Sequence, residues 1–340
     1  MVLYCTTQSI LSSRNRVLYF FLKKNLGNYF IKNENKNKSI FSNLNLIIKH
    51  KPKVVIIGFN SRILFLFLWF FKFKNNFKLI YDLGYPVTDI NDLNFFRKKI
   101  LVFLDFIGIK TSDLILLESK EQKCIFSNRA KFSLVHYAYT EYEYKDNNEF
   151  YPVIDSKYIL FRGRLNEESG IINCINAFQK YKINGSLSLV IHGWGKLESK
   201  VRNEVNKNPS QIILIDSFLK ESEMLSLIKN SEALIGQSKK SDLRLQKTIP
   251  HKCFEAIFFN KPYLSFLYPP LLDLFEDKYE LIGLQLDPNK NNFIDIFNNL
   301  ENISVKNINS IAKMVKSNFE SKLKKNNDKL IKTINDFIKY

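Results

Sequence analysis

Residues 158–182 read YILFRGRLNEESGIINCINAFQKYK. Residues 158–161 form an apolar run of strand length, and from Ile171 onward the apolar side chains recur at the spacing of a helix. The polar loop between them contains Gly163, which lets the backbone turn tightly. A buried strand that passes through a short glycine-containing loop into a helix is the repeating unit of α/β proteins with parallel sheets. The stretch therefore predicts one such unit.

The same alternation continues on both sides of this unit. Towards the carboxyl end it predicts strands at 187–192, 211–215 and 233–236, and helices at 197–206, 221–230 and from about residue 250. Towards the amino end it predicts strands at 2–6, 54–58, 78–81 and 113–117, and helices at 16–24, 39–49, 63–71 and 95–107.

The chain of 340 residues is long enough for two domains. A polar, tyrosine-rich segment at 137–153 interrupts the alternation and predicts an interdomain connection. We expect a first domain at 1–150, a second at 157–306, and amphipathic helices at 307–340 that pack back on the first. The predicted fold class is α/β with two doubly wound, Rossmann-like domains. In such folds a ligand binds at the carboxyl ends of the strands, here in a cleft between the domains.

The composition predicts a globular protein with a basic surface. Apolar residues make up 45% of the chain, and 51 basic against 33 acidic residues give a net charge of +18. This charge suits phosphorylated ligands, anionic lipid or nucleic acid, but an AT-rich genome would also produce a Lys- and Asn-rich chain. No aromatic-basic recognition motif or zinc spacing is present, so we expect no nucleic-acid partner.

The four cysteines are scattered and form no C-x-x-C pair, which predicts neither a zinc site nor disulfides and fits a reducing cytoplasm. The amino terminus lacks the pattern of a secretory signal. The longest apolar run, 63–71, is well short of the roughly 20 residues that span a bilayer. Basic residues flank this run. We expect its helix to be buried against the sheet, with contact to anionic lipid as the alternative.

Two glycine-containing loops follow predicted strands. Arg162-Gly163-Arg164 combines a close backbone approach with guanidinium groups that match phosphate oxygens, although a surface arginine pair around a turn would look the same. Gly193 and Gly195 follow the strand at 187–192, where they admit a ligand to the backbone or only form a tight turn.

A third stretch, IPHKCFEAIFFNKP at 249–262, predicts an anion site. Pro250 suits the first position of a helix, whose amides and positive dipole end would point into a loop that carries Arg244 and Lys247. We include Lys252, in the same turn, among the predicted anion ligands.

Glu255 lies on an otherwise apolar stretch of this predicted helix. Its carboxylate is suited to accept hydrogen bonds from a sugar diol such as a ribose. The alternative is an ion pair with Lys252 or Lys261 on a solvated face of the helix.

The blocks RGRL, EESGI, INAF, IHGWG, IPHKCFEA and NKPYL, in this order over 158–266, resemble the carboxyl-terminal half of GT-B glycosyltransferases, in particular the retaining glycosyltransferase family 4. Over residues 1–150 the resemblance rests on the order of strands and helices. It implies a UDP- or GDP-linked nucleotide-sugar donor bound mainly by the second domain and an acceptor bound mainly by the first. It also implies no metal and no resident cofactor.

Carried over residue by residue, the resemblance makes Arg164 the diphosphate-binding arginine and Glu255 the ribose-binding glutamate. It places the glycine turn near the nucleotide and Ser217–Leu219 against the base, so the residues implied there are Gly193, Gly195, Phe218 and Leu219. Asp82 and Glu255 are the predicted catalytic residues. Asp82 follows the strand at 78–81, where the family presents a polar residue to the sugar or acceptor, but Gly84 and Pro86 also make it a candidate turn or helix-cap residue.

Other positions depart from, or only loosely match, the family's pattern. Ser169 stands where many members have lysine, and Lys247 stands where the paired-glutamate motif has an acid. Arg162, Arg244 or Lys247 would replace the missing phosphate contact. Arg14 is expected near the donor phosphates on the first domain.

The resemblance implies a cytoplasmic, metal-independent, retaining hexosyltransferase that acts on a glycan or lipid-linked acceptor in bacterial surface polysaccharide synthesis, such as O-antigen, capsule or lipooligosaccharide. Peripheral association with an anionic membrane is compatible with the basic first domain. The alternative is a catalytically inactive GT-B subunit that binds a nucleotide or glycan.

Overall fold

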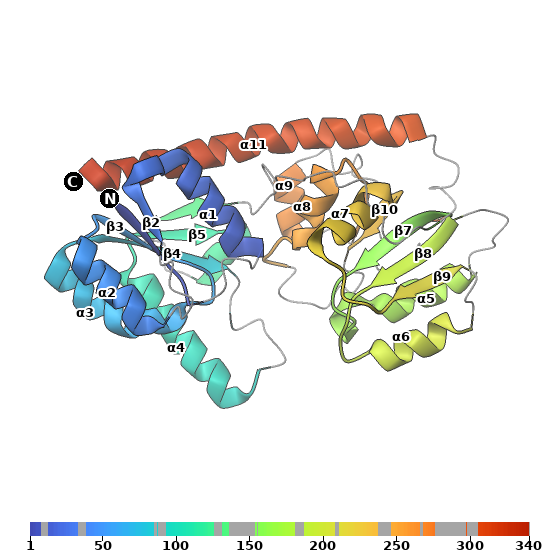
Figure 1. Ribbon diagram of the computed structural model, residues 1–340, viewed down its shortest axis with the longest axis horizontal. Helices are drawn as coiled ribbons and strands as arrows, with labels where there is room; N and C mark the ends of the chain where they lie inside the picture. The colour runs from blue at the N-terminus through green and yellow to red at the C-terminus, as the bar shows by residue number, and fades with distance from the viewer. Residues whose placement is uncertain are drawn as a thin grey trace. The chain divides into compact units, whose positions relative to one another are not determined.

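The computed structural model describes residues 1–7, 13–32, 39–84, 87, 93–125, 131–135, 154, 156–180, 187–207, 211–236, 246–265, 268–275, 297 and 305–339. The chain forms two compact units. Unit 1 comprises Met1–Tyr137, Gln246–Thr248 and Ser321–Tyr340, and unit 2 comprises Ala138–Leu245 and Ile249–Glu320. Each unit holds one parallel sheet with helices (Figure 1), so the prediction of an α/β protein with two such domains is confirmed.

Unit 1 contains a six-stranded parallel sheet in the order β2-β1-β3-β4-β5-β6. The central strands are fully buried because helices cover both faces. The order reverses between β1 and β3, which makes their carboxyl ends the topological switch point. The strands are β1 (Val2–Cys5), β2 (Phe30–Lys32), β3 (Val54–Ile57), β4 (Lys78–Gly84), β5 (Leu114–Leu117) and β6 (Phe132–Leu134).

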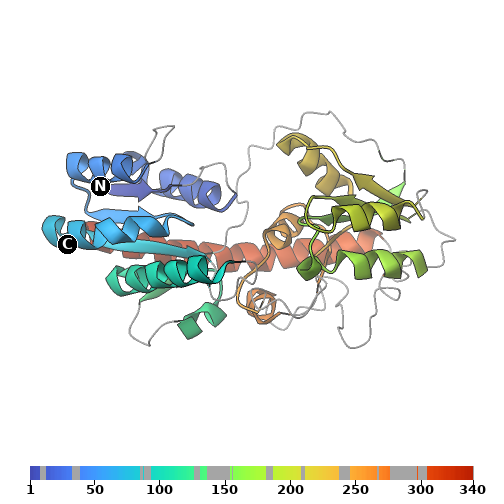
Figure 2. The ribbon, with the colours of Figure 1, turned by 90° about the horizontal axis from the view of Figure 1, so that it is seen from below.

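Successive residues of these strands point to opposite faces of the sheet and pack in two separate cores. Leu3, Val55 and Ile57 face α2 (Ile40–His50), α3 (Phe65–Asn75) and α4 (Phe95–Thr111). Val2, Val54 and Ile56 face α1 (Ser13–Leu26) and the end of the last helix. Figures 1 and 2 show α2, α3 and α4 side by side on one face of the sheet.

Unit 2 contains a five-stranded parallel sheet in the order β11-β10-β7-β8-β9, and its switch point lies between β7 and β10. Helix α5 connects β7 to β8 and α6 connects β8 to β9, α7 leads from β9 back to β10, and α8 connects β10 to β11. The elements are β7 (Lys157–Arg162), α5 (Ile171–Lys180), β8 (Leu187–His192), α6 (Glu198–Val205), β9 (Ile212–Ile215), α7 (Glu221–Asn230), β10 (Ala233–Ile235), α8 (His251–Phe258), β11 (Tyr263–Leu264) and α9 (Pro269–Phe275).

One helix of 35 residues, α11 (Val305–Lys339), contributes to both units. In unit 2, Phe319 packs on Phe254 of α8 with ring centroids 5.7 Å apart. In unit 1, Leu330 and Ile334 are fully buried in the core that α1 also covers. The end of the chain thus completes the first unit.

The structure differs from the expectations in detail. The boundary lies at Tyr137/Ala138 rather than at residue 150, and three residues before α8 cluster with unit 1. The predicted connection at 137–153 lies outside the described residues. Three edge strands, β2, β6 and β11, and the helix α9 were not predicted. Among the residues that the structure describes, no helix is long and apolar enough to span a membrane.

Replacing Leu330 by alanine should lower the free energy of unfolding by about 2–5 kcal/mol, because it leaves a cavity in the core of unit 1. Urea denaturation measures this loss. Lys329→Ala, at an exposed neighbouring position of α11, is the control and should change stability by less than about 0.5 kcal/mol. Equal stabilities of the two variants would show that α11 does not complete this core.

Candidate functional site

In unit 2, the loops that follow β7 and β8 are held together by backbone hydrogen bonds. The Gly163 amide donates to the His192 carbonyl oxygen at 3.0 Å, and the Leu165 amide donates to the Trp194 carbonyl oxygen at 2.9 Å. The Leu197 amide then donates to the Leu165 carbonyl oxygen at 2.8 Å. The two predicted ligand loops therefore form one continuous backbone platform beyond the strand ends.

Glycine is required at both positions of the second loop. A Cβ on Gly193 would lie 1.8 Å from the Gly163 carbonyl oxygen, and a Cβ on Gly195 would lie 2.6 Å from the Leu165 carbonyl oxygen. Both distances are far inside van der Waals contact, so any side chain would separate the loops. The glycines therefore allow the close contact between the two loops.

Across the switch point, the β7 loop meets helix α8 through an ion pair. Nη1 of Arg162 lies 2.5 Å from both carboxylate oxygens of Glu255, and Nδ1 of His251 lies 3.3 Å from Oε1. Glu255 is completely buried. The expected alternative, a pair with Lys252 or Lys261 on a solvated face, is therefore wrong.

The Glu255 carboxylate is ionised despite its burial. Burial alone would raise its pKa, but the Arg162 guanidinium and the hydrogen bond from His251 outweigh this and lower the pKa to about 2. Both of its oxygens therefore remain hydrogen-bond acceptors at neutral pH.

Lys252 brings a second cation to the same place. Its Nζ lies 4.8 Å from the centre of the Phe161 ring and 3.5 Å from the Ile235 carbonyl oxygen at the end of β10. Burial, with repulsion from Arg162, lowers the pKa of Lys252 to about 8, although Glu255 acts in the opposite direction. With Arg162 and Glu255 neutralising each other, Lys252 leaves a surplus positive charge at the switch point.

The other predicted anion ligands lie in different parts of the structure. Pro250 is the N-cap of α8 rather than its first helical residue, and no side chain caps this end. Arg164 is exposed on the first loop. Arg244 lies outside the described residues. Lys247 clusters with unit 1, where the Ser119 hydroxyl donates to its carbonyl oxygen at 2.6 Å.

An aromatic pair borders the same edge of the unit 2 sheet. Trp194, between the two glycines, and Phe218, after β9, have ring centroids 6.4 Å apart and are both exposed. Leu219, the residue after Phe218, is buried. Burial, with repulsion from Arg162, lowers the pKa of the neighbouring His192, so its imidazole is neutral at neutral pH. Phe218 was predicted from the sequence to lie near the base, whereas Trp194 was not predicted.

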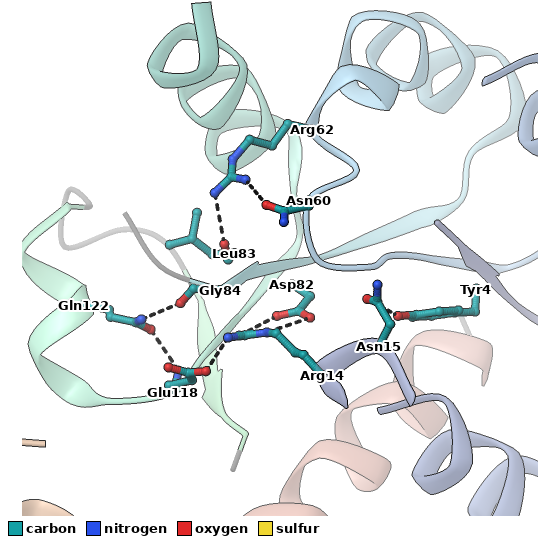
Figure 3. Close-up of polar contacts among 10 residues, drawn as sticks. All are labelled: Tyr4, Arg14, Asn15, Asn60, Arg62, Asp82, Leu83, Gly84, Glu118 and Gln122. Atoms are coloured by element: carbon teal, nitrogen blue, oxygen red, sulfur yellow. Dashed lines mark hydrogen bonds and ion pairs between the residues drawn. The ribbon is translucent and has the colours of Figure 1, made fainter. Parts of the chain in front are cut away.

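In unit 1, Arg14 of α1 lies between two carboxylates at the carboxyl edge of the sheet (Figure 3). Its Nη2 and Nε donate to the two oxygens of Asp82 at 2.9 and 3.3 Å, and its Nη1 donates to Glu118. All three residues are buried. One guanidinium thus bonds to two carboxylates that are 36 residues apart in the sequence.

Neighbouring groups fix this cluster in place. The backbone amide of Glu118 donates to Oε1 of Gln122 at 2.8 Å, and the amide nitrogen of Gln122 donates to the Gly84 carbonyl oxygen. The aromatic ring of Phe59 lies 4.9 Å from the Arg14 guanidinium carbon. Asp82 lies inside β4 and is neither a turn nor a helix-cap residue. Glu118 was not predicted as a site residue, because it belongs to a polar stretch after β5 that has no motif of its own.

Ser169 has a structural contact in place of the family's lysine. Its hydroxyl donates to the Asn166 carbonyl oxygen at 2.7 Å. Within the part of the chain that the structure describes, no group of three or more histidine, cysteine or acidic side chains is arranged to hold a metal ion.

Two parallel α/β units with loops gathered at the strand ends are the architecture of the GT-B glycosyltransferases. Residues 145–314, half of the chain, match the sequence profile described as Glycosyl transferases group 1, and the chain belongs to this family. No curated protein sequence matches the chain.

Solved structures share the fold at low sequence identity. Anabaena Alr3699/HepE in complex with UDP superposes with a TM-score of 0.68 at 10% identity, covering 98% of this chain and 99% of that one. A trehalose-phosphate synthase from Burkholderia xenovorans gives 0.67 at 9% identity over 99% and 100%. The lipopolysaccharide outer core galactosyltransferase WaaB gives 0.59 at 13% identity over 94% and 98%.

Replacing Lys252 by methionine should stabilise the protein by on the order of 1 kcal/mol at pH 7, because it removes a desolvated cation. The unfolded chain binds more protons than the folded one between pH about 8 and 10.5, so wild-type stability rises through that window and the variant should lose this rise. Urea denaturation across this range measures both effects. Lys200→Met, at an exposed site of α6, is the control and should keep the wild-type pH profile. The same profile in Lys252→Met would contradict the lowered pKa of Lys252.

Replacing Arg14 by methionine should cost about 3–5 kcal/mol of folding stability, because it leaves two buried carboxylates without their cation. Glu118→Gln, whose amide oxygen still accepts from Arg14, should stay within about 1 kcal/mol of the wild type. Urea denaturation at pH 7 compares the two. Similar losses in both variants would show that Arg14 does not hold the cluster together.

Proposed function

We propose that the chain transfers a hexosyl unit, with retention of configuration and without a metal or resident cofactor, from a UDP- or GDP-linked sugar to a glycan or lipid-linked acceptor. The membership in the glycosyltransferase family supports the reaction class. We further propose a cytoplasmic role in bacterial surface polysaccharide synthesis. The structural likeness to WaaB, described as a lipopolysaccharide galactosyltransferase, and to HepE, crystallised with UDP and with UDP-glucose, supports this choice.

The observation that carries the donor assignment is the surplus cation at the unit 2 switch point. A diphosphate needs positive charge, and Lys252 together with the exposed Arg164 supplies it beside the uncapped end of α8. Burying a lysine without a full partner is costly, and an anionic ligand removes that cost. This favours phosphate binding over a purely structural role for Lys252.

The other parts of a nucleotide match the surrounding groups. The ionised carboxylate of Glu255 is suited to accept hydrogen bonds from the ribose hydroxyls, with Arg162 and His251 holding it in place. Trp194 and Phe218 offer exposed rings on which a base can stack. Gly193 and Gly195 hold the loop that carries Trp194 against the loop that carries Arg164.

We assign the acceptor to the carboxyl edge of unit 1. The carboxylate oxygens of Asp82 and Glu118, which Arg14 holds in place, are suited to accept hydrogen bonds from sugar hydroxyl groups. Because the donor phosphates would be neutralised by arginine, lysine and helix amides, no metal is needed for their departure. The departing diphosphate would then accept the proton of the attacking hydroxyl on the same face of the sugar, which retains the configuration.

A second candidate is an inactive subunit that binds a nucleotide or glycan. The internal hydrogen bond of Ser169, where many members have lysine, favours this alternative. So does the close ion pair between Arg162 and Glu255, which a ribose must share.

Thermal shift with UDP, GDP, ADP and their sugar conjugates should show that one nucleotide series stabilises the wild type. Lys252→Met should bind the same series with about tenfold lower affinity, because a phosphate contact is lost. Lys200→Met should bind as the wild type does. Proton NMR of the sugar released or transferred should then show the anomeric configuration of the donor retained. Binding without turnover would support the inactive subunit. No binding of any nucleotide would contradict the transferase and leave only an inactive subunit that binds a glycan.

A further inference from the structure

Helices α3 and α4, with the short turn before α3, expose an unusual amount of apolar surface. Twelve large apolar side chains within 62–75 and 95–111 are more than a third exposed. Phe70 is 64% exposed, Phe73 78% and Phe96 75%. Isolated exposed apolar residues are normal in proteins, but such a concentration on two neighbouring helices marks an interaction surface. The expectation that the helix at 63–71 is buried is therefore wrong for most of its side chains.

The exposed residues follow the helical period and lie opposite the core. In α3, Leu66, Trp69, Phe70 and Phe73 form the exposed stripe, while Phe65 and Leu68 reach the core. In α4, Phe96, Phe103 and Phe106 repeat at helical spacing. The two helices pack side by side on the same face of the unit 1 sheet (Figures 1 and 2). Together they form what we call the α3–α4 face.

Every exposed charge on the α3–α4 face is basic. Lys74, Arg97, Lys99 and Lys110 are exposed, and α3 contains no acidic residue. The one acid of α4, Asp105, is buried and bonded to Arg62 and to the hydroxyl of Tyr81. The face is thus apolar and cationic without any exposed carboxylate.

Two lysines of α4 lie over exposed aromatic rings. Nζ of Lys99 lies 4.3 Å from the centre of the Phe95 ring, and Nζ of Lys110 lies 5.7 Å from that of Phe106. The stems of Lys98 and Lys99, with Phe103 and Phe106, line a shallow groove along α4. Lysines in this position keep an ammonium group at the level of lipid phosphates while the rings enter the acyl region.

We propose that the α3–α4 face binds the surface of an anionic lipid bilayer, with Trp69, Phe70, Phe73 and Phe96 inserted at the boundary between the headgroups and the acyl chains. Aromatic side chains favour this interface, and lysine and arginine are attracted to anionic lipid. A second copy of the chain is disfavoured as the occupant because two faces of the same positive charge would repel each other. The proposal stands independently of the transfer reaction, and loss of catalytic activity would leave it unchanged.

The test uses vesicles of phosphatidylcholine with phosphatidylglycerol, compared with phosphatidylcholine alone. The full chain should co-sediment with the anionic vesicles, and binding should weaken about tenfold when NaCl rises from about 0.05 to about 0.5 M. The chain has two tryptophans, so Trp194→Phe leaves Trp69 as the single reporter. Its emission should shift to the blue and be quenched by brominated acyl chains. A Trp69 that is not quenched would overturn the proposal.

The triple variant Phe70→Ser/Phe73→Ser/Phe96→Ser should bind anionic vesicles at least about tenfold more weakly. Phe20→Ser, at an exposed phenylalanine of α1 on the opposite face of the sheet, should bind as the wild type does. Lys74→Glu/Lys99→Glu tests the charge without removing aromatic rings, with Lys23→Glu on α1 as its control. Unchanged binding in both α3–α4 variants would overturn the proposal. So would a dimer in analytical ultracentrifugation that the triple variant abolishes without any lipid binding.

Discussion

The burial of both faces of each parallel sheet is the constraint on which the rest of the structure depends. Because helices cover the strands on both sides, a charged side chain within a strand must be paired, and most charges are confined to the strand ends. There they meet charges from neighbouring strands and must be neutralised. Unit 1 achieves this with one arginine between two carboxylates, and unit 2 with an arginine-glutamate pair beside a lysine. Each unit therefore gathers its buried charged side chains at the carboxyl edge of its sheet, which is where doubly wound folds bind their ligands.

The central strands and most helices were predictable from the sequence because full burial produces continuous apolar runs. Val54–Ile57 and Leu187–His192 are such runs, and their helices follow at the expected spacing. The missed strands β2, β6 and β11 each have one neighbour in the sheet and are two or three residues long. An edge strand needs fewer apolar residues, since half of its backbone pairing and part of its burial are absent. Periodicity carries too little signal at that length, and backbone pairing with the neighbour decides the strand.

The residue types of the site were predictable, but their pairing was not. Arg162 and Glu255 are 93 residues apart, and Arg14 and Glu118 are 104 residues apart. Their contact depends on strand order, because β10 returns to lie beside β7, and no local pattern encodes that order. Arg162 therefore holds the carboxylate that the sequence assigned to a ribose. Trp194 was not predicted for a different reason. The glycines on either side of it indicate a role of the backbone, and only the pairing of the exposed indole with Phe218 indicates a role of the side chain.

Helix α3 shows how composition can mislead about burial. A helix that is apolar on all sides is ordinarily enclosed in a core, and FLFLWFFKFKN meets that description. A single layer of helices on a sheet, however, can bury only the stripe that faces the strands, so the remaining side of α3 is left to the surface. On an ordinary surface, acids and lysines would be interspersed along that side. Here the acid of α4 is turned inward to Arg62 and Tyr81, and the lysines remain outside among the rings. A general excess of lysine in the chain accounts for the exposed lysines, but it does not account for the buried Asp105 or the exposed rings. One partner that is both anionic and apolar explains the charge and the apolar surface together.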